Sequence, residues 1–139
     1  MNSRRKAIFD GVTGARLVLA FSGLVAVAIA ATILAAPQAF YGSYGIEVVG
    51  NATLVNELKA PAGTLLIAGL LMFAGVFRAS FAVVSLVTAT AVYLSYGLSR
   101  VLSIVVDGIP HSGIVSAAGI EIVIGVICLL TLLHFRRAN

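Results

Sequence analysis

Four long runs of apolar residues follow one another along this chain, and they constrain its fold more than any other feature. The runs span about residues 14–36, 57–77, 79–106 and 113–134. A helix needs about 20 apolar residues to cross the hydrocarbon core of a bilayer. Charged residues make up only 10% of the 139 residues, whereas soluble domains carry about 25%. The sequence therefore predicts an all-α fold, an integral membrane four-helix bundle with antiparallel neighbours, in which residues 1–139 form a single domain.

The basic residues gather at one side of the predicted membrane. They precede the first run, occupy the turn between the second and third runs, and follow the fourth: Arg4, Arg5, Lys6, Arg16, Arg78, Arg136 and Arg137. Only Lys59 falls on the opposite side. Because loops rich in Lys and Arg stay in the cytoplasm, we expect both termini to be cytoplasmic and the loops 37–56 and 107–112 to face outward. The aromatic residues of the first loop suit the outer membrane interface.

Several classes of function find no support in the residues. The net charge of +4 is carried at the ends of the runs and forms no separate basic patch, so no nucleic-acid partner is expected. The single cysteine, Cys128, excludes an intrachain disulfide and a zinc cluster of cysteines. No nucleophile–base pair and no metal-ligand spacing is visible. We therefore expect no catalytic residues, no metal and no cofactor, and the residues favour a non-enzyme without settling that question.

Three charged residues inside the apolar runs are the most informative part of the sequence. The turn at 107–112 places Arg100 of the third run level with Glu121 of the fourth. The turn at Arg78 places the same Arg100 level with Glu57 of the second run. A charge that faces lipid at mid-bilayer costs about 2.5–3.5 kcal/mol. We therefore expect Glu57, Arg100 and Glu121 to face the interior of the bundle as a polar cluster in the outer leaflet.

Helical spacing supports this placement, because Tyr96, Arg100 and Asp107 share one face of the third run. The facing surfaces of the second and fourth runs are rich in Ala and Gly, which lets membrane helices pack closely. Asp107 lies two turns above Arg100 and also fits an ordinary Asp-Gly turn. The cluster as a whole either binds a polar group or serves only to fix the helix register.

A second line of small residues runs along the third run, slightly offset from the polar face. It contains Ser95, Ser99 and Ser103, and a line of small residues at this spacing is typical of helix packing. The sequence leaves open whether the line packs against the first run or against a partner chain.

Two stretches of the second half resemble a bacterial family labelled domain of unknown function 4345, which is distantly similar to the DoxX-type four-helix membrane proteins. They are "ELKAPAG" at 57–63 and "SRVLSIVVDGIP" at 99–110, followed by Glu121 in the last run. The resemblance covers most of residues 37–137. It implies a four-helix fold in a bacterial inner (cytoplasmic) membrane and marks Glu57, Arg100 and Asp107 as family features. It brings no established activity.

Three hypotheses for the function follow. In the first, a small inner-membrane protein binds a lipid-like or other hydrophobic small molecule at the outward-facing polar cluster. In the second, the chain is an accessory or structural subunit that packs against a larger membrane protein complex, or against its own copies, through the serine line. A transporter or an intramembrane enzyme is less favoured, because no broken helix pair and no internal repeat is visible.

Overall fold

The computed structural model describes residues 3–138, with side chains for residues 12–137. The chain forms the helices α1 (Ser3–Ala35), α2 (Pro37–Gly42), α3 (Ala52–Phe77), α4 (Ala82–Asp107) and α5 (Ser112–Ala138), and a short 3-10 turn, η1 (Ala79–Phe81), precedes α4. The described part of the chain contains no strand. Four helices are long and apolar enough to cross a membrane. The predicted all-α membrane bundle is confirmed.

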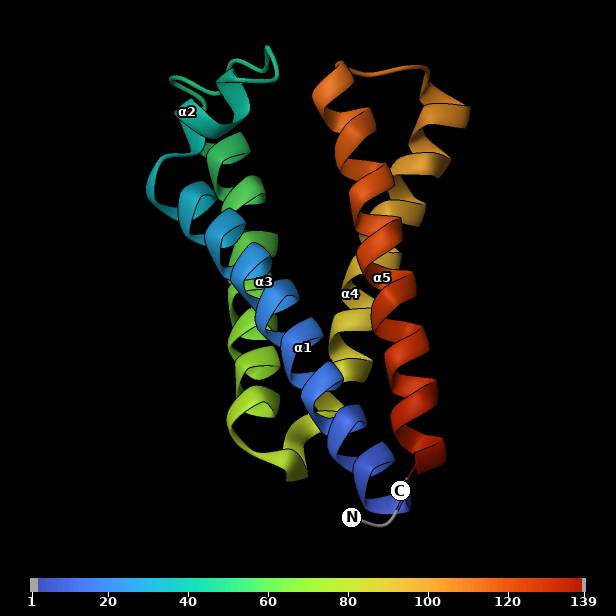
Figure 1. The fold of residues 1–139 in the computed structure, drawn as a ribbon. Helices are drawn as coiled ribbons and strands as arrows, with labels where there is room; N and C mark the ends of the chain where they lie inside the picture. Colours follow the sequence, from blue (N-terminus) through green and yellow to red (C-terminus); the bar gives the residue numbers. More distant parts are fainter. Residues whose placement is uncertain (1–2, 139) are drawn as a thin grey trace.

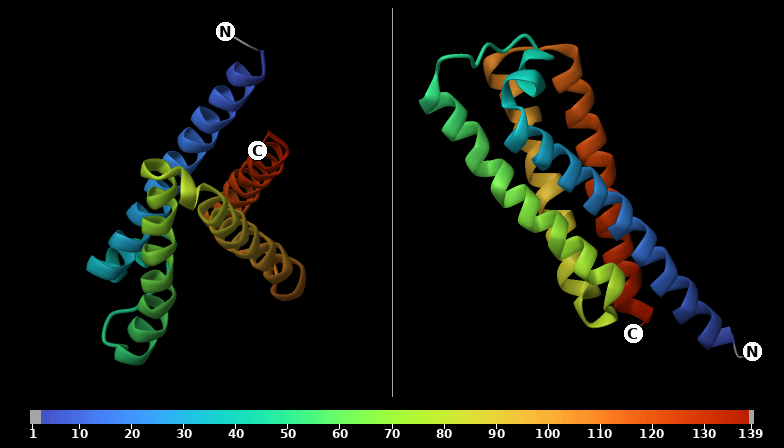
Figure 2. Two further views of the ribbon diagram at one scale, coloured as in Figure 1. Left: turned by 90° about the horizontal axis from the view of Figure 1, so that it is seen from below. Right: turned by 90° about the vertical axis from the view of Figure 1, so that its left-hand side faces the viewer.

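The long helices form two antiparallel pairs (Figures 1 and 2). Helix α1 packs along α3, and α4 packs along α5. The pairs meet at the end of the molecule where the Arg78 turn joins α3 to η1, and they diverge toward the end that carries α2. The two ends are called here the Arg78 end and the α2 end. The turn between α4 and α5 lies at the α2 end.

Helix α3 begins at Ala52, ahead of the start predicted at residue 57. The Asn51 side chain caps the helix, because its Oδ1 atom accepts a hydrogen bond from the backbone N–H of Leu54 at 2.9 Å. Pro61 then lies inside the helix, where its ring leaves the carbonyl of Glu57 without the usual N–H donor. Glu57 therefore occupies the second turn of the helix instead of its beginning.

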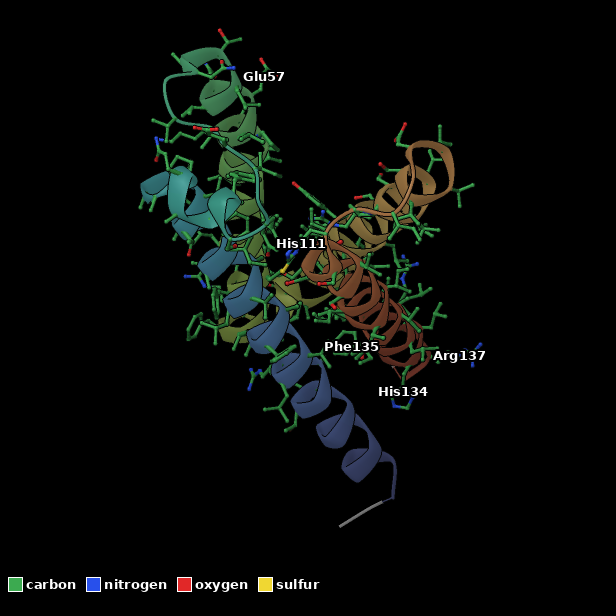
Figure 3. All side chains as sticks on the ribbon, turned by 90° about the horizontal axis from the view of Figure 1, so that it is seen from above. Glu57, His111, His134, Phe135 and Arg137 are labelled. Atoms are coloured by element: carbon green, nitrogen blue, oxygen red, sulfur yellow. The ribbon has the colours of Figure 1, made fainter. Side chains whose placement is uncertain are left out.

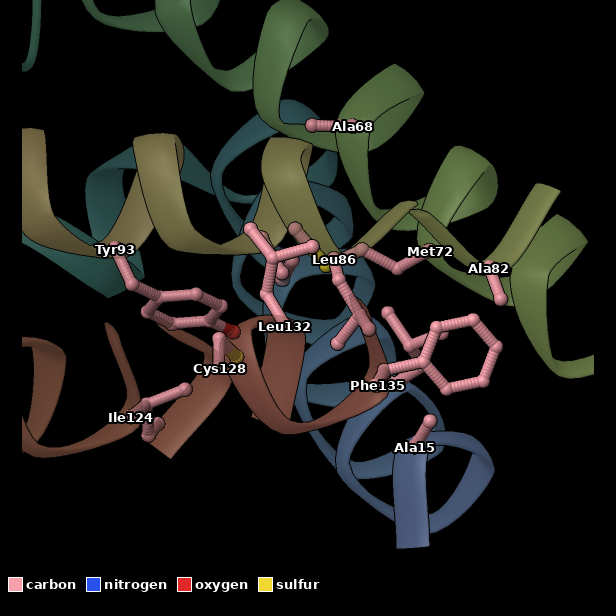
Figure 4. Packing of buried hydrophobic residues seen from close by; sticks show 13 residues of the cluster. Ala15, Ala68, Met72, Ala82, Leu86, Tyr93, Ile124, Cys128, Leu132 and Phe135 are labelled. Carbon is pink, nitrogen blue, oxygen red and sulfur yellow. The ribbon is translucent and has the colours of Figure 1, made fainter. Parts of the chain in front are cut away.

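The buried apolar core lies in the half of the molecule nearer the Arg78 end (Figure 4). It is formed by side chains from all four long helices, among them Leu19, Met72, Leu86, Cys128 and Phe135. Two hydrogen bonds join the helix pairs in the same region. The Tyr93 hydroxyl donates to the carbonyl of Ser22 in α1 at 2.6 Å, and the Ser85 hydroxyl donates to the carbonyl of Leu71 in α3 at 2.6 Å.

Glycine residues set the spacing within each helix pair. A Cβ atom at Gly97 would lie 2.6 Å from Cγ1 and 3.1 Å from the backbone nitrogen of Ile122, and one at Gly69 would lie 3.1 Å from the backbone nitrogen of Val27. Contacts this short between backbones require glycine. Because lipid offers no hydrophobic drive for helices to associate, this close packing is a main source of stability.

Gly97→Ala is expected to lower the free energy of unfolding by about 1–3 kcal/mol, because the added methyl group overpacks the contact with Ile122. Gly119→Ala is the matched control on α5, since no atom lies within 4 Å of the added Cβ. We expect the control to remain within about 0.5 kcal/mol of the wild type. Thermal unfolding in mild detergent, followed by circular dichroism, measures both changes. Equal effects of the two substitutions would contradict the assigned packing.

Candidate functional site

A pocket of about 440 Å³ lies between the two helix pairs, in the half of the molecule nearer the α2 end. It occupies the space left by the divergence of the pairs, and it adjoins the buried core, because Ala26, Tyr93 and Ile124 belong to both. Most of its wall is apolar, with side chains such as Ile29 from α1, Leu65 from α3 and Ile124 from α5. Its charged lining side chains, among the described residues, are Arg100 and Glu121.

Arg100 and Glu121 form an ion pair across the α4–α5 interface. The Arg100 Nε atom donates a hydrogen bond to Glu121 Oε2 at 2.9 Å. The side chains are 34% and 15% exposed, respectively, so the carboxylate is the more enclosed member. Gly97, one helical turn before Arg100, brings α4 against α5 at Ile122, the residue after Glu121. The close backbone approach thus holds the two charges in contact, and the pairing lowers the cost of a carboxylate at membrane depth.

The predicted contact between Arg100 and Glu57 is absent, so the prediction that Glu57 joins the polar cluster was wrong. Within residues 12–137, Arg100–Glu121 is the single ion pair shorter than 4.0 Å. Glu57 is exposed and lies near the end of α3 at the α2 end of the molecule, apart from α4 and α5 (Figure 3). The physical reason is the divergence of α3 from α4, which separates residues that a straight hairpin would place side by side.

Tyr96 and Asp107, which were predicted to share a polar face with Arg100, lie in different environments. Tyr96 lines the pocket together with Arg100. Asp107 is exposed and lies outside the pocket lining. Its carboxylate Oδ2 accepts a hydrogen bond at 2.9 Å from the hydroxyl of Ser103, one turn earlier in α4. Asp107 is therefore held by its own helix and does not join the Arg100 pair.

The serine line on α4 faces away from the rest of the chain. Ser95, Ser99 and Ser103 are all exposed, so the line does not pack against α1. The Ser95 hydroxyl donates to the carbonyl of Val92 in the same helix at 3.0 Å. A role for this line in contacts with another chain stays a prediction.

An aromatic cluster from α2 and the following loop closes the pocket at the α2 end. The Phe40 ring lies 5.2 Å from the Tyr41 ring and 5.6 Å from the Tyr44 ring, centroid to centroid, in edge-on geometry. All three residues line the pocket. The Tyr44 ring also lies 5.9 Å from the ring of His111 in the α4–α5 turn. This contact connects the loops of the two helix pairs at the end where the pairs diverge, and Figure 3 shows His111 there.

Tyr41 interacts electrostatically with two polar groups of the pocket wall, Tyr96 and Arg100. Burial raises the pKa of Tyr41, and the neighbouring Tyr96 hydroxyl raises it further. The Arg100 guanidinium acts in the opposite direction and lowers the pKa. Tyr41 is thus near enough to Tyr96 and Arg100 to interact with both. From the sequence we expected the aromatic residues of this segment at the outer membrane interface, and we did not associate them with Arg100.

The chemistry available in the pocket is hydrogen bonding and charge. Among the described residues, no group of three or more His, Cys, Asp or Glu side chains is placed to hold a metal ion. The polar wall offers a guanidinium, a carboxylate and tyrosine hydroxyls. An arrangement of this kind can orient the polar end of a bound molecule whose remainder lies against apolar side chains.

Comparison with known protein families gives one match, to a family described as a domain of unknown function (DUF4345), over residues 14–132. No curated protein and no solved structure matches the chain, so the distant similarity to DoxX-type proteins stays a prediction. The matched region contains the second and third membrane-crossing helices in full and omits only residues 12–13 of the first and 133–137 of the fourth, and it includes every residue of the pocket wall. The chain therefore belongs to the DUF4345 family, as a small multi-pass membrane protein.

Proposed function

We propose that this protein binds a lipid-like or other hydrophobic small molecule in the pocket between its helix pairs, with the polar end of that molecule at Arg100 and Glu121. The observation that carries the proposal is the position of this ion pair in the wall of an otherwise apolar pocket of about 440 Å³. Known ligand pockets have volumes of about 300–1,000 Å³, with mostly apolar walls and a few well-placed polar groups.

The burial of the ion pair gives further support. A pair that served only to fix the helix register could be shielded fully between α4 and α5. Arg100 instead keeps 34% of its side chain exposed and contributes to the pocket wall. A charged group that reaches into an apolar space is a typical anchor for the polar end of a ligand.

The proposal includes an orientation in a bacterial inner membrane. The exposed residues Arg16, Arg78, Arg136 and Arg137 belong to segments that lie at the Arg78 end (Figure 1), while the side chains of Arg4, Arg5 and Lys6 lie outside the described residues. We place the Arg78 end and both termini in the cytoplasm, because basic loops are retained there. The pocket then lies in the outer half of the bilayer.

A second candidate function is that of an accessory subunit in a larger membrane assembly. The observation that favours it is the exposure of Ser95, Ser99 and Ser103, a line of small residues that no helix of the chain covers. Such lines allow close approach of a helix from another membrane protein or from a second copy of the same chain.

Ala117→Phe is expected to remove the bound molecule, because Ala117 lines the pocket one helical turn before Glu121 and a phenyl ring there occupies the space beside the ion pair. Ala91→Phe is the matched control, since Ala91 is exposed on α4 and outside the pocket lining. Both variants and the wild type are purified in mild detergent, extracted with organic solvent and analysed by mass spectrometry. We expect one compound class at near-stoichiometric amounts in the wild type and the control, and a loss of about tenfold or more in Ala117→Phe. Equal content in all three proteins would refute the proposal.

The proposed orientation predicts the behaviour of fusions at the C-terminus. A fluorescent protein that folds only in the cytoplasm is expected to fluoresce when it follows residue 139, and alkaline phosphatase at the same position is expected to be inactive. Insertion of the phosphatase after Gly45, in the loop at the α2 end, should give an active enzyme. The reverse pattern would place the Arg78 end outside.

The subunit hypothesis predicts that Ser99→Leu releases a partner, because the larger side chain blocks close helix approach at the serine line. The measurement is the set of proteins that co-purify in mild detergent. Leu98→Ala serves as the control on the neighbouring exposed face of α4. Recovery of the wild type only as a lone monomer would count against this function.

A further inference from the structure

We infer that the pocket selects a single-chain amphiphile with an uncharged, oxygen-bearing head, and that it discriminates against charged heads through the neutral Arg100–Glu121 pair. This inference rests on the proposed function and deepens it. Three features of the site carry it: the hydrogen-bonding groups that the pair leaves free, the tyrosines that share the pocket wall with the pair, and the charge balance of the wall.

The ion pair uses only part of its hydrogen-bonding capacity. Within residues 12–137, the bond from Arg100 Nε to Glu121 Oε2 is the single hydrogen bond of either side chain. A guanidinium has five N–H donors, and four of them belong to the two Nη atoms. Those four donors and the Glu121 Oε1 acceptor therefore have no partner in the described part of the protein. The pair can donate to a carbonyl or ether oxygen and accept from a hydroxyl group.

Two tyrosines share the pocket wall with the ion pair. Tyr41 and Tyr96 line the pocket together with Arg100 and Glu121, and Tyr96 lies one helical turn before Arg100 on the same face of α4. Neither hydroxyl has a hydrogen-bond partner among the described residues. The hydroxyl of Tyr93, in contrast, is already bound to the carbonyl of Ser22. Tyr41 and Tyr96 can each donate to and accept from an oxygen-bearing head.

The charge balance decides which kind of head is favoured. Arg100 and Glu121 neutralise each other, and they are the charged side chains of the described pocket wall. An anionic head would compete with Glu121 for Arg100, and a cationic head would compete with Arg100 for Glu121. Either exchange leaves one partly buried charge without its partner, which is unfavourable beside an apolar pocket wall. An uncharged head uses the free donors and acceptors without disturbing the pair.

The volume limits the apolar part of the ligand. A pocket of about 440 Å³ lies in the lower part of the range of about 300–1,000 Å³ that holds drug-sized molecules. This space suits the head and adjoining segment of one acyl or isoprenoid chain. A phospholipid with two chains and a phosphate would need more room, and its phosphate would disrupt the ion pair.

The test compares three radiolabelled probes with the same oleyl chain and different heads: monooleoylglycerol, oleyl sulfate and oleyltrimethylammonium. Binding to the full-length protein in nanodiscs of uncharged lipid is measured by scintillation proximity. The Ala117→Phe variant in identical nanodiscs supplies the blank for partition into the bilayer. For the wild type we expect monooleoylglycerol to bind at least about tenfold more tightly than either charged probe.

Glu121→Gln provides the decisive variant, because it removes the carboxylate and leaves Arg100 without its anion. The ratio of its affinity for oleyl sulfate to its affinity for monooleoylglycerol should rise by about tenfold or more over that of the wild type. Arg100→Gln should show the mirror result, with a gain for oleyltrimethylammonium. Glu57→Gln is the matched control, since Glu57 is exposed and outside the pocket lining, and it should keep the wild-type order of affinities.

The outcomes separate the inference from the proposed function. Equal wild-type affinities for the three probes, or tighter binding of a charged probe, would overturn the inference and leave ligand binding intact. The wild-type comparison does not use Glu121→Gln, so a folding defect in that variant does not remove the test. Binding of all three probes at the level of the Ala117→Phe blank would overturn both the inference and the proposed function.

Discussion

Close backbone contact at glycine is the constraint on which the rest of this structure depends. Helices in lipid gain no hydrophobic free energy from association, so they must approach closely to gain packing energy. Gly69 and Gly97 supply that approach within the α1–α3 and α4–α5 pairs. Between the pairs, Gly75 of α3 contacts Ser85 of α4 near the Arg78 end. The pairs are thus joined at one end and diverge at the other, and the divergence creates the pocket.

The sequence was sufficient to predict the membrane-crossing helices and the level of Arg100 relative to Glu121. The length and composition of the apolar runs determine the membrane-crossing helices. The short turn before Ser112 determines that Arg100 is level with Glu121, because α4 and α5 remain packed along their length. The same reasoning failed for Glu57. A helical hairpin determines which residues of its two helices are level along the helix axes, but it does not determine the distance between the helices. That distance depends on side chains in α1 and α5, which no local pattern reveals.

The aromatic wall of the pocket shows a second limit of sequence reasoning. Tyr41 lies in the short helix α2, and its position near Tyr96 and Arg100 depends on how α2 folds back over the divergent pairs. The bond from Tyr93 to Ser22 is equally non-local, since 71 residues separate the two partners. The hydrogen bond between Ser103 and Asp107 could have been predicted from the sequence, because residues four apart in a helix are neighbours. That local contact explains why Asp107, on the same face as Arg100, takes no part in the pocket.

The placement of the polar groups also links ligand binding to stability. Arg100 and Tyr96 belong to the α4–α5 pair, whereas Tyr41 belongs to the segment that follows α1. At the α2 end, the ring contact between Tyr44 and His111 connects the loops of the two pairs. A head group bound to both Arg100 and Tyr41 would add a second connection where the helices diverge. A molecule that binds only the folded protein stabilises it by mass action, and here the stabilisation would act on the least tightly packed half of the bundle.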